Sequence, residues 1–392
     1  MTRDRHDAAG RPALIAGFAT PPATQAYAQG VAGQTADGHF SDFTRQRIRL
    51  SSIGVGTFPG AATPDTDQRV AEIVSRALCQ GLNVIDCAAH YRYGRALPAV
   101  GAGLREAMAA GVSREAVFLI SKGGFLTYDG GRPADPEAWF EQHITAAGLG
   151  SREDLAKGAH LLSPAYIDYQ IERSRVEMGV ETLDAFLVDQ PEVHIPEIGK
   201  EHLNRKLVGV FTQLERAVQE RRIRYYGIST YDGFRVETDD ARFQSIPALL
   251  GLAERAAREA TGQERARHHF KLVQLPFNQV MLEGFTRFNC ATGAGNVAAT
   301  LQACHQLNVY VMASHTMLKG HLARESLDVV SRSLAGLANP AQRALQFNRS
   351  TPGLGTTLVG ISDPAHLDDA LAVAKIAPVE RKAYLSMYQR AE

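Results

Sequence analysis

The segment NVIDCAAHYRYG, residues 83–94, determines how the rest of the chain is interpreted. Its apolar pair, Val84 and Ile85, ends in Asp86, and Tyr91 follows five residues later across a turn of small residues. This order is typical of a buried parallel strand whose C-terminal end opens into a ligand pocket. A carboxylate in such a place is costly to bury without a cation. A lysine ending a neighbouring strand would neutralise it and could make the tyrosine a proton donor near neutral pH.

Such a lysine, Lys122, ends the next expected strand. Similar apolar runs recur along the chain, and each is followed by a segment with helical spacing of apolar residues. The expected strands lie at 48–56, 83–86, 117–122, 184–189, 225–229, 272–275, 309–312 and 357–360. The expected helices lie at about 70–78, 97–110, 164–178, 207–218, 246–259, 296–307, 340–349 and 365–374. Ser163 and Asn339, each followed by proline, predict two helix N-caps.

Eight strand-then-helix units predict an α/β protein, and eight is the number that closes a (β/α)8 TIM barrel. The alternative is a doubly wound open sheet, which usually has fewer units and a glycine-rich fingerprint after its first strand. A barrel needs about 250 residues, whereas this chain has 392. We assign the surplus to an N-terminal extension, residues 1–46, packed on a barrel at 47–392. Further surplus lies in long loops after strands three, four and seven, of which 123–162 is the largest.

Charge and composition exclude several classes of protein. Lysine plus arginine and aspartate plus glutamate both number 42, without a basic block, which argues against nucleic acid as a partner. No apolar run approaches the roughly 20 residues of a membrane span, and the N-terminus lacks the apolar centre of a secretory signal. The four cysteines show no metal-ligand spacing and indicate a reducing compartment. We expect a cytoplasmic protein without a metal that acts on a small molecule, as a monomer or small homo-oligomer.

In a barrel, catalytic residues come from the C-terminal ends of several strands. Asp86 and Lys122 end consecutive strands and can pair. Lys122 beside the Tyr91 hydroxyl would lower the pKa of that phenol from about 10. A tyrosine tuned in this way can give a proton to a carbonyl oxygen and take it back. Polar residues also follow the other strands. Taken together they are stronger evidence for an active site at the strand ends than any one of them alone.

Seven pieces of the chain together resemble the aldo-keto reductase superfamily over about residues 47–376. The chain also resembles a divergent bacterial branch of that superfamily, whose members have an N-terminal arm similar to residues 1–46. These pieces are Gly54–Thr57, Asn83–Gly94, Ser121–Lys122, Asp184–Pro191, Ile223–Thr230, Val273–Asn278 and Leu358–Ser362. The resemblance implies a nicotinamide cofactor, NAD(P)H, with Tyr91 as general acid/base tuned by Asp86 and Lys122. It also implies a set of cofactor-binding residues, running from the nicotinamide to the adenosine end: Thr57, Ser229, Thr230, Gln274, Ser314, His315, Gly360, Ser362 and His366.

The chain departs from that family at the fourth catalytic position, where Asp189 replaces a histidine that hydrogen-bonds the substrate carbonyl. An ionised aspartate only accepts hydrogen bonds, so it would repel an oxyanion, and it could draw Lys122 away from Tyr91. Held protonated by burial and by Asp86, it could donate instead. A family branch with glutamate here reduces a carbon–carbon double bond conjugated to a ketone. Alternatively another donor, such as His90, His194 or water, takes over the role.

Residues 360–366 lack the lysine and arginine that commonly bind the 2′-phosphate of NADP. Asp363 would repel a phosphate and His366 is mostly neutral at pH 7, so the sequence favours NAD over NADP. Lys319 or Arg324 could nevertheless reach in from the seventh loop. Two further residues could contact substrate: Arg92 could hold an anion or form a surface pair, and Trp139 could floor an apolar pocket or order its own loop.

The first hypothesis is an NAD(P)(H)-dependent oxidoreductase acting on a carbonyl, an alcohol or a conjugated alkene. The alternative is a non-redox lyase, isomerase or dehydratase that uses Asp86, Tyr91, Lys122 and Asp189 for proton transfer. A third hypothesis is a non-catalytic sensor or partner subunit that binds nucleotide; the intact Asp86, Tyr91 and Lys122 argue against it.

Overall fold

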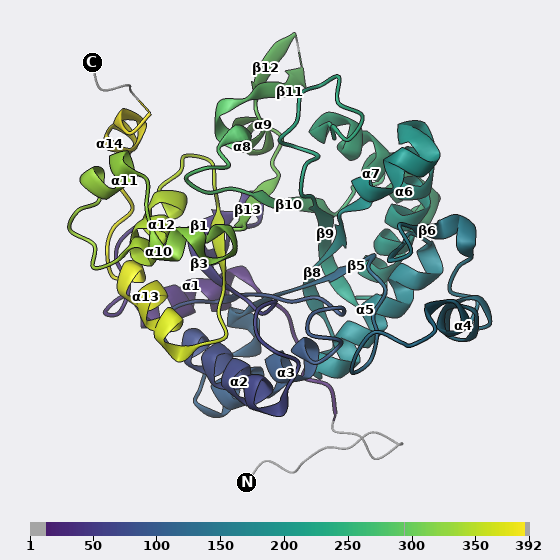
Figure 1. Cartoon of the computed structure of the whole chain (residues 1–392), viewed down its shortest axis with the longest axis horizontal. Coiled ribbons are helices and arrows are strands. Elements are labelled where there is room, and N and C mark those ends of the chain that lie inside the picture. Colours follow the sequence, from purple (N-terminus) through teal and green to yellow (C-terminus); the bar gives the residue numbers. More distant parts are fainter. Residues whose placement is uncertain (1–12, 294, 389–392) are drawn as a thin grey trace.

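The computed structural model describes residues 13–293 and 295–388. Eight parallel strands close into a barrel, and helices surround it (Figure 1). In barrel order the strands are β3 (Ile53–Gly56), β4 (Val84–Asp86), β5 (Phe118–Gly123), β8 (Leu183–Asp189), β9 (Ile223–Ser229), β10 (Phe270–Pro276), β13 (Tyr310–Ser314) and β14 (Thr356–Gly360). The predicted (β/α)8 barrel is confirmed, and the open doubly wound sheet is wrong.

Helices surround the strands close to the positions that the apolar spacing predicts, except for the helix expected at 296–307. They are α2 (Pro64–Cys79), α3 (Ala96–Ala109), α5 (Pro164–Met178), α6 (Ile195–Gln219), α7 (Ile246–Thr261), α9 (Thr300–Gln306), α12 (Pro340–Arg349) and α13 (Pro364–Ala374). The side chain of Ser163 accepts from the Tyr166 amide, and that of Asn339 from the Gln342 amide, so both predicted N-caps are confirmed. Shorter helices are α1 (Pro21–Gly30), α4 (Pro136–Phe140), α8 (Glu283–Thr286), α10 (His321–Arg324), α11 (Asp328–Ser333) and α14 (Arg381–Ser386).

The first expected strand, 48–56, is in fact two strands. Its first half, β2 (Ile48–Ser51), pairs antiparallel with β1 (Phe40–Phe43), and only the second half is β3 of the barrel. The buried Phe43 ring lies 5.1 Å, centroid to centroid, from each of the Phe118, Tyr225 and Tyr310 rings. These three rings lie at or near the starts of β5, β9 and β13, so the β1–β2 hairpin closes the N-terminal end of the barrel.

Two other expectations about elements are wrong. The helix expected at 296–307 begins only at Thr300, because β12 (Asn296–Ala299) pairs with β11 (Phe288–Gly293) as a hairpin (Figure 1). The loop after the fourth barrel strand is not long: a 3₁₀ turn at Pro191–His194 leads directly into α6, which is 25 residues long and interrupted at Gly199. The residues at 296–297, asparagine and valine, are compatible with a strand as well as with a helix. The prolines at 191 and 196 are compatible with a loop as well as with the start of a helix, so the sequence did not distinguish these alternatives.

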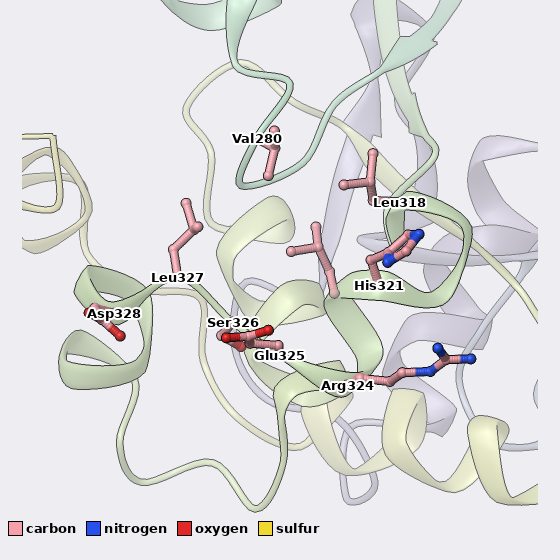
Figure 2. Close-up of a pocket in the computed structure, with 9 residues that line it drawn as sticks. Val280, Leu318, His321, Arg324, Glu325, Ser326, Leu327 and Asp328 are labelled. Carbon is pink, nitrogen blue, oxygen red and sulfur yellow. The ribbon is translucent and has the colours of Figure 1, made fainter.

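The loops after β5 and β13 are long, as predicted. The first contains α4, the short hairpin of β6 (Leu155–Ala156) and β7 (His160–Leu161), and its own apolar cluster. The second, together with the loop after β10, lines an open hollow of about 710 Å³ (Figure 2). Figure 2 shows Val280 facing the segment 318–328 across this hollow. Within the described ranges, no helix is both long and apolar enough to cross a membrane.

Candidate active site

Asp86, Tyr91 and Lys122 meet at the C-terminal ends of β4 and β5. The Lys122 ammonium nitrogen Nζ lies 2.5 Å from Asp86 Oδ2 and 2.9 Å from the Tyr91 hydroxyl oxygen. The carbonyl oxygen of Cys87, 3.5 Å away, accepts its third hydrogen. Lys122 is 1% exposed and Asp86 5%, so both charges are buried and each neutralises the other. The lysine therefore has a fixed position beside the phenol.

The pKa of Tyr91 differs from the expected direction. Burial raises this pKa above the ordinary value of 10, and the opposing charge of Lys122 does not overcome that effect. The expectation of a lowered pKa is therefore wrong, because the sequence shows the lysine but not how little water reaches the ring. For Lys122, burial lowers the pKa, but Asp86, Tyr91 and Asp189 together raise it above its ordinary value. At neutral pH the phenol keeps its proton and the lysine keeps its charge.

Asp189 ends β8 and is 4% exposed. Burial raises its pKa to about 6, while the charge of Lys122 opposes the rise. Near pH 6 the carboxyl group is therefore present in both forms, as a donor and as an acceptor. Lys122 is not drawn away, since its closest partners remain Asp86 and Tyr91.

His90 lies next to these groups. Its ring packs against the rings of Tyr91 and Phe125, with centroid distances of 4.9 and 5.1 Å. Its Nε2 atom is 4.0 Å from Asp189 Oδ2, and its Nδ1 atom is buried without a hydrogen-bond partner in the described part of the chain. Burial and the charge of Lys122 lower the pKa of His90 to about 3, so the imidazole is neutral at pH 7.

Two further histidines, His160 and His194, form a hydrogen-bonded chain that ends at the backbone carbonyl of Asp189. His160 Nε2 lies 2.6 Å from the backbone carbonyl oxygen of Asp189, and His160 Nδ1 lies 2.8 Å from His194 Nε2. A carbonyl only accepts, so His160 carries its proton on Nε2 and accepts a hydrogen bond from His194. Burial lowers the pKa of His160 to about 3 and that of His194 to about 4. His194 is thus separated from Asp189 by His160, and sequence reasoning missed His160 because it lies in the insertion that shows no period.

Two expected cofactor residues connect directly to the catalytic carboxylate. Ser229 donates to the amide oxygen of Gln274 at 3.0 Å, and the Gln274 amide nitrogen donates to Asp86 Oδ1 at 3.2 Å. Thr57 donates its hydroxyl hydrogen to the backbone carbonyl of Asp86 at 3.0 Å. The ends of β3, β4, β9 and β10 are therefore joined through polar side chains.

The Thr230 hydroxyl takes part in a hydrogen bond within the protein. It donates to Glu192 at 2.6 Å, and the same carboxylate oxygen accepts from the amides of Tyr231 and Asp232 at 2.8 and 3.3 Å. Glu192, 4% exposed, was not identified from the sequence. Burial raises its pKa, and the loop after β9 is held to the turn after β8 through it.

The remaining expected cofactor residues follow β13 and β14. Ser314 Oγ lies 3.4 Å from His315 Nδ1, and the His315 ring packs against Tyr231 at a centroid distance of 5.1 Å. Gly360 ends β14, Ser362 is half-buried, and His366 is exposed in the first turn of α13. Because β9, β10, β13, β14 and β3 are successive in the barrel, these residues form one continuous arc along its mouth.

Two expected substrate residues are not brought together with Tyr91. The guanidinium of Arg92 is buried against Asp67, with an NH1–Oδ1 distance of 2.6 Å. Trp139 packs in the insertion against Tyr128 and His143, at centroid distances of 4.7 and 4.9 Å. Among the residues the structure describes, no group of three or more His, Cys, Asp or Glu side chains could hold a metal ion.

Residues 52–241 match the sequence model of the Aldo/keto reductase family. No curated protein matches the chain in sequence. Among solved structures, an aldo-keto reductase from Bacillus halodurans (AKR11C1, holo form) is similar, with a TM-score of 0.59 and 16% identity over 89% of this chain and 95% of that one. An aldo/keto reductase from Klebsiella pneumoniae in complex with NADP and acetate has a TM-score of 0.55 and 17% identity over 88% and 93%. At these identities the likeness shows a shared fold.

Proposed function

The chain belongs to the aldo-keto reductase superfamily through residues 52–241, and from this premise we propose that it is an NAD(P)(H)-dependent oxidoreductase. Its substrate is a small molecule with a carbonyl, an alcohol or a conjugated alkene, and Tyr91 is the general acid/base. The observation that carries the proposal is the position of Lys122 Nζ, 2.5 Å from Asp86 and 2.9 Å from the Tyr91 hydroxyl.

Tyr91, Lys122 and Asp86 together carry out the transfer of the proton to and from the substrate oxygen. Burial keeps the Tyr91 phenol protonated, so it can donate to the oxygen of a carbonyl being reduced. The positive charge of Lys122 stabilises the phenolate that remains, and Asp86 fixes the lysine in place. In oxidation Tyr91 acts as the base only after it has released its own proton, and the resulting phenolate then takes the proton of an alcohol. When bound, a nicotinamide cofactor would supply or accept the hydride.

The arc of polar residues at the mouth fits such a cofactor. Ser229 and Gln274 offer a hydroxyl and an amide, which suit the carboxamide of a nicotinamide. Gly360 and Ser362 lie just before the N-terminus of α13, where backbone amides favour phosphate. Residues 360–366 contain no lysine or arginine, and the exposed Asp363 would repel a 2′-phosphate. We therefore propose a preference for NAD over NADP.

Titration of the purified protein with NADH and NADPH, followed by nicotinamide fluorescence and calorimetry, tests the proposal. We expect saturable binding, tighter for NADH. In a screen of small aldehydes, ketones, alcohols and enones, Tyr91→Phe should keep cofactor affinity and lower turnover by about 10²- to 10⁴-fold. If neither cofactor binds, the protein is not an oxidoreductase of this kind.

A second candidate is a non-redox lyase, isomerase or dehydratase. It is favoured by the pairing of a protonated Tyr91 with a nearby carboxyl group, Asp189, whose pKa is about 6. Two titratable groups whose environments separate their pKa values are typical of an acid and a base acting together. Product formed by the cofactor-free protein would support this candidate, and a strict requirement for NADH or NADPH would exclude it.

A further inference from the structure

A substrate oxygen that receives the Tyr91 proton also needs a second hydrogen-bond donor, because negative charge develops on it before the proton arrives. This requirement rests on the proposed function. The neighbours of Tyr91 supply few candidates. The Lys122 hydrogens go to Asp86, to Tyr91 and to the Cys87 carbonyl. Asp189, once ionised, only accepts.

Gln274 and the buried histidines are the other donors near Asp189. The Gln274 amide nitrogen gives one hydrogen to Asp86 and its oxygen accepts from Ser229, while its second hydrogen is assigned to the nicotinamide carboxamide under the proposed function. The His160 and His194 Nε2–H groups donate to the Asp189 carbonyl and to His160, respectively. Of the ring nitrogens described around this cluster, His90 Nε2 is the one near Asp189 that lacks a partner within hydrogen-bond distance, since its distance to Asp189 Oδ2 is 4.0 Å.

The surroundings of His90 also select which of its nitrogens carries the proton. Nδ1 is buried without a partner, so a proton there would be a donor with no acceptor, and the Nε2 lone pair would face a carboxylate. A proton on Nε2 is attracted by the Asp189 carboxylate. In that tautomer the buried atom without a partner is only the acceptor Nδ1, which carries a lone pair and no hydrogen. The neutral ring therefore presents Nε2–H on the side of Asp189, and Tyr91 and Phe125 hold its orientation.

We propose that His90 is a catalytic residue: its Nε2–H donates a hydrogen bond to the substrate oxygen that receives the proton of Tyr91, and the Asp189 carboxylate orients the imidazole. The gap of 4.0 Å is too wide for a direct His90–Asp189 hydrogen bond, so the N–H remains available to an incoming oxygen. Aspartate at the end of β8 and histidine in the loop after β4 thus act as one unit.

The first test is a long-range proton–nitrogen NMR spectrum of the ¹⁵N-labelled protein, with the His90 signals assigned by their loss in His90→Phe. We expect a neutral ring with Nε2 protonated from pH 5 to 8. A proton on Nδ1, or a ring that takes up a second proton near pH 6.5, would overturn the proposal. This measurement needs neither cofactor nor turnover.

The second test is the reduction of 4-nitrobenzaldehyde, an activated aldehyde, with NADH or NADPH. His90→Phe keeps a flat ring but removes the donor, so kcat should fall by about 10²-fold, the usual loss for one oxyanion donor, with little change in KM. His90→Gln, which retains an N–H, should recover part of the loss. His143→Phe, changed on the insertion surface, should behave as wild type.

The outcomes separate this inference from the proposed function. If Tyr91→Phe abolishes turnover and His90→Phe leaves kcat unchanged, His90 is not catalytic and the oxidoreductase proposal stands. If His90→Phe weakens cofactor binding as strongly as it lowers kcat, the residue is structural and the inference is wrong. If 4-nitrobenzaldehyde is not reduced, the position of the His90 proton still decides: Nδ1 overturns the proposal and Nε2 supports it.

Discussion

Lys122 couples the proposed chemistry to the stability of the fold. Its ammonium group and the Asp86 carboxylate are both buried, with relative exposures of 1% and 5%. Breaking a buried pair by removing one partner leaves an uncompensated charge, which costs far more than losing a surface pair. The same residue thus fixes the phenol of Tyr91 and neutralises the end of β4.

Lys122→Met should lower the free energy of unfolding by about 3–5 kcal/mol, because it leaves Asp86 buried without a cation. The double variant Lys122→Met/Asp86→Asn should regain much of that loss. Lys206→Met provides a control, since Lys206 pairs with Asp154 at a partly exposed site and its removal should cost about 1 kcal/mol or less. Guanidinium denaturation followed by circular dichroism measures all three, and equal losses for Lys122→Met and Lys206→Met would contradict the prediction.

Asp189 should make stability depend on pH with an unusual sign for an aspartate. Its pKa in the folded protein, about 6, lies above the ordinary value of 3.8. The folded state therefore binds the proton more tightly, and this contribution to stability is complete below about pH 4 and lost as the pH rises through 6. The change corresponds to about 3 kcal/mol. Relative to Asp189→Asn, the wild type should lose about that much between pH 4 and 7 in urea unfolding; a parallel pH dependence of the two proteins would disprove it.

At the residue level, the sequence identified the side chains that form the cluster but not their environment. The spacing of Asp86, Tyr91 and Lys122 at consecutive strand ends predicts proximity, because parallel strands end on the same side of a barrel. Burial is a property of the assembled molecule, so the direction of the Tyr91 pKa shift could not be deduced. His160 and Glu192 were missed for a related reason: each acts through backbone groups of distant loops, which leave no local pattern.

The β1–β2 hairpin should contribute strongly to stability as an element. Phe43 is fully buried at the closed end of the barrel, where it contacts the rings of Phe118, Tyr225 and Tyr310. Phe43→Ala should lower the free energy of unfolding by about 3–5 kcal/mol, since a buried ring is lost and a cavity is left. Phe288→Ala is the matched control, because Phe288 is 68% exposed and its loss should change stability by about 0.5 kcal/mol or less. Comparable losses for the two variants in chemical denaturation would show that the hairpin does not support the barrel.

Element boundaries could be predicted where caps were present and not where apolar runs were continuous. Ser163 and Asn339 marked true helix starts, since their side chains accept hydrogen bonds from the first turn. The run 48–56 carries no turn signal, yet Ser52 separates two strands that belong to different sheets. The distinction depends on pairing with β1, a long-range contact that local patterns do not encode.

For the whole molecule, counting strand-then-helix units was sufficient to predict the barrel, because eight such units in right-handed order close on themselves. What the count could not predict is how the extra segments attach. The buried Arg349 illustrates this: it donates to Ser52 Oγ at 2.9 Å and to the carbonyl of Val373 at 2.6 Å, and its NH2 atom lies 3.4 Å from His39 Nδ1. It thereby joins the N-terminal extension to the start of the barrel and to the end of α13.

Several buried histidines should make the whole fold sensitive to acid. His39, His160 and His194 are at most 1% exposed, and burial lowers their pKa values to about 3, 3 and 4. Their neutral forms contribute stability that is complete above the ordinary pKa of about 6.5 and is lost as the pH falls towards those values. Between about pH 6 and pH 4.5 the unfolded chain binds between two and three more protons at these sites than the folded protein does.

Each such proton changes the free energy of unfolding by about 1.4 kcal/mol per pH unit, so the three histidines give at most about 4 kcal/mol per unit. Asp189, which holds its proton in the folded state over much of this range, offsets about one of them. We therefore expect a net loss of about 3 kcal/mol per pH unit from these groups and acid unfolding at a moderately low pH.

Urea unfolding at half-unit steps of pH measures how steeply the free energy of unfolding falls with pH. His39→Gln should reduce the slope by about one proton, because His39 is the one of the three that lies at the closed end of the barrel, away from the catalytic cluster. A slope near zero, or one that His39→Gln leaves unchanged, would mean that these imidazoles are already protonated in the folded protein.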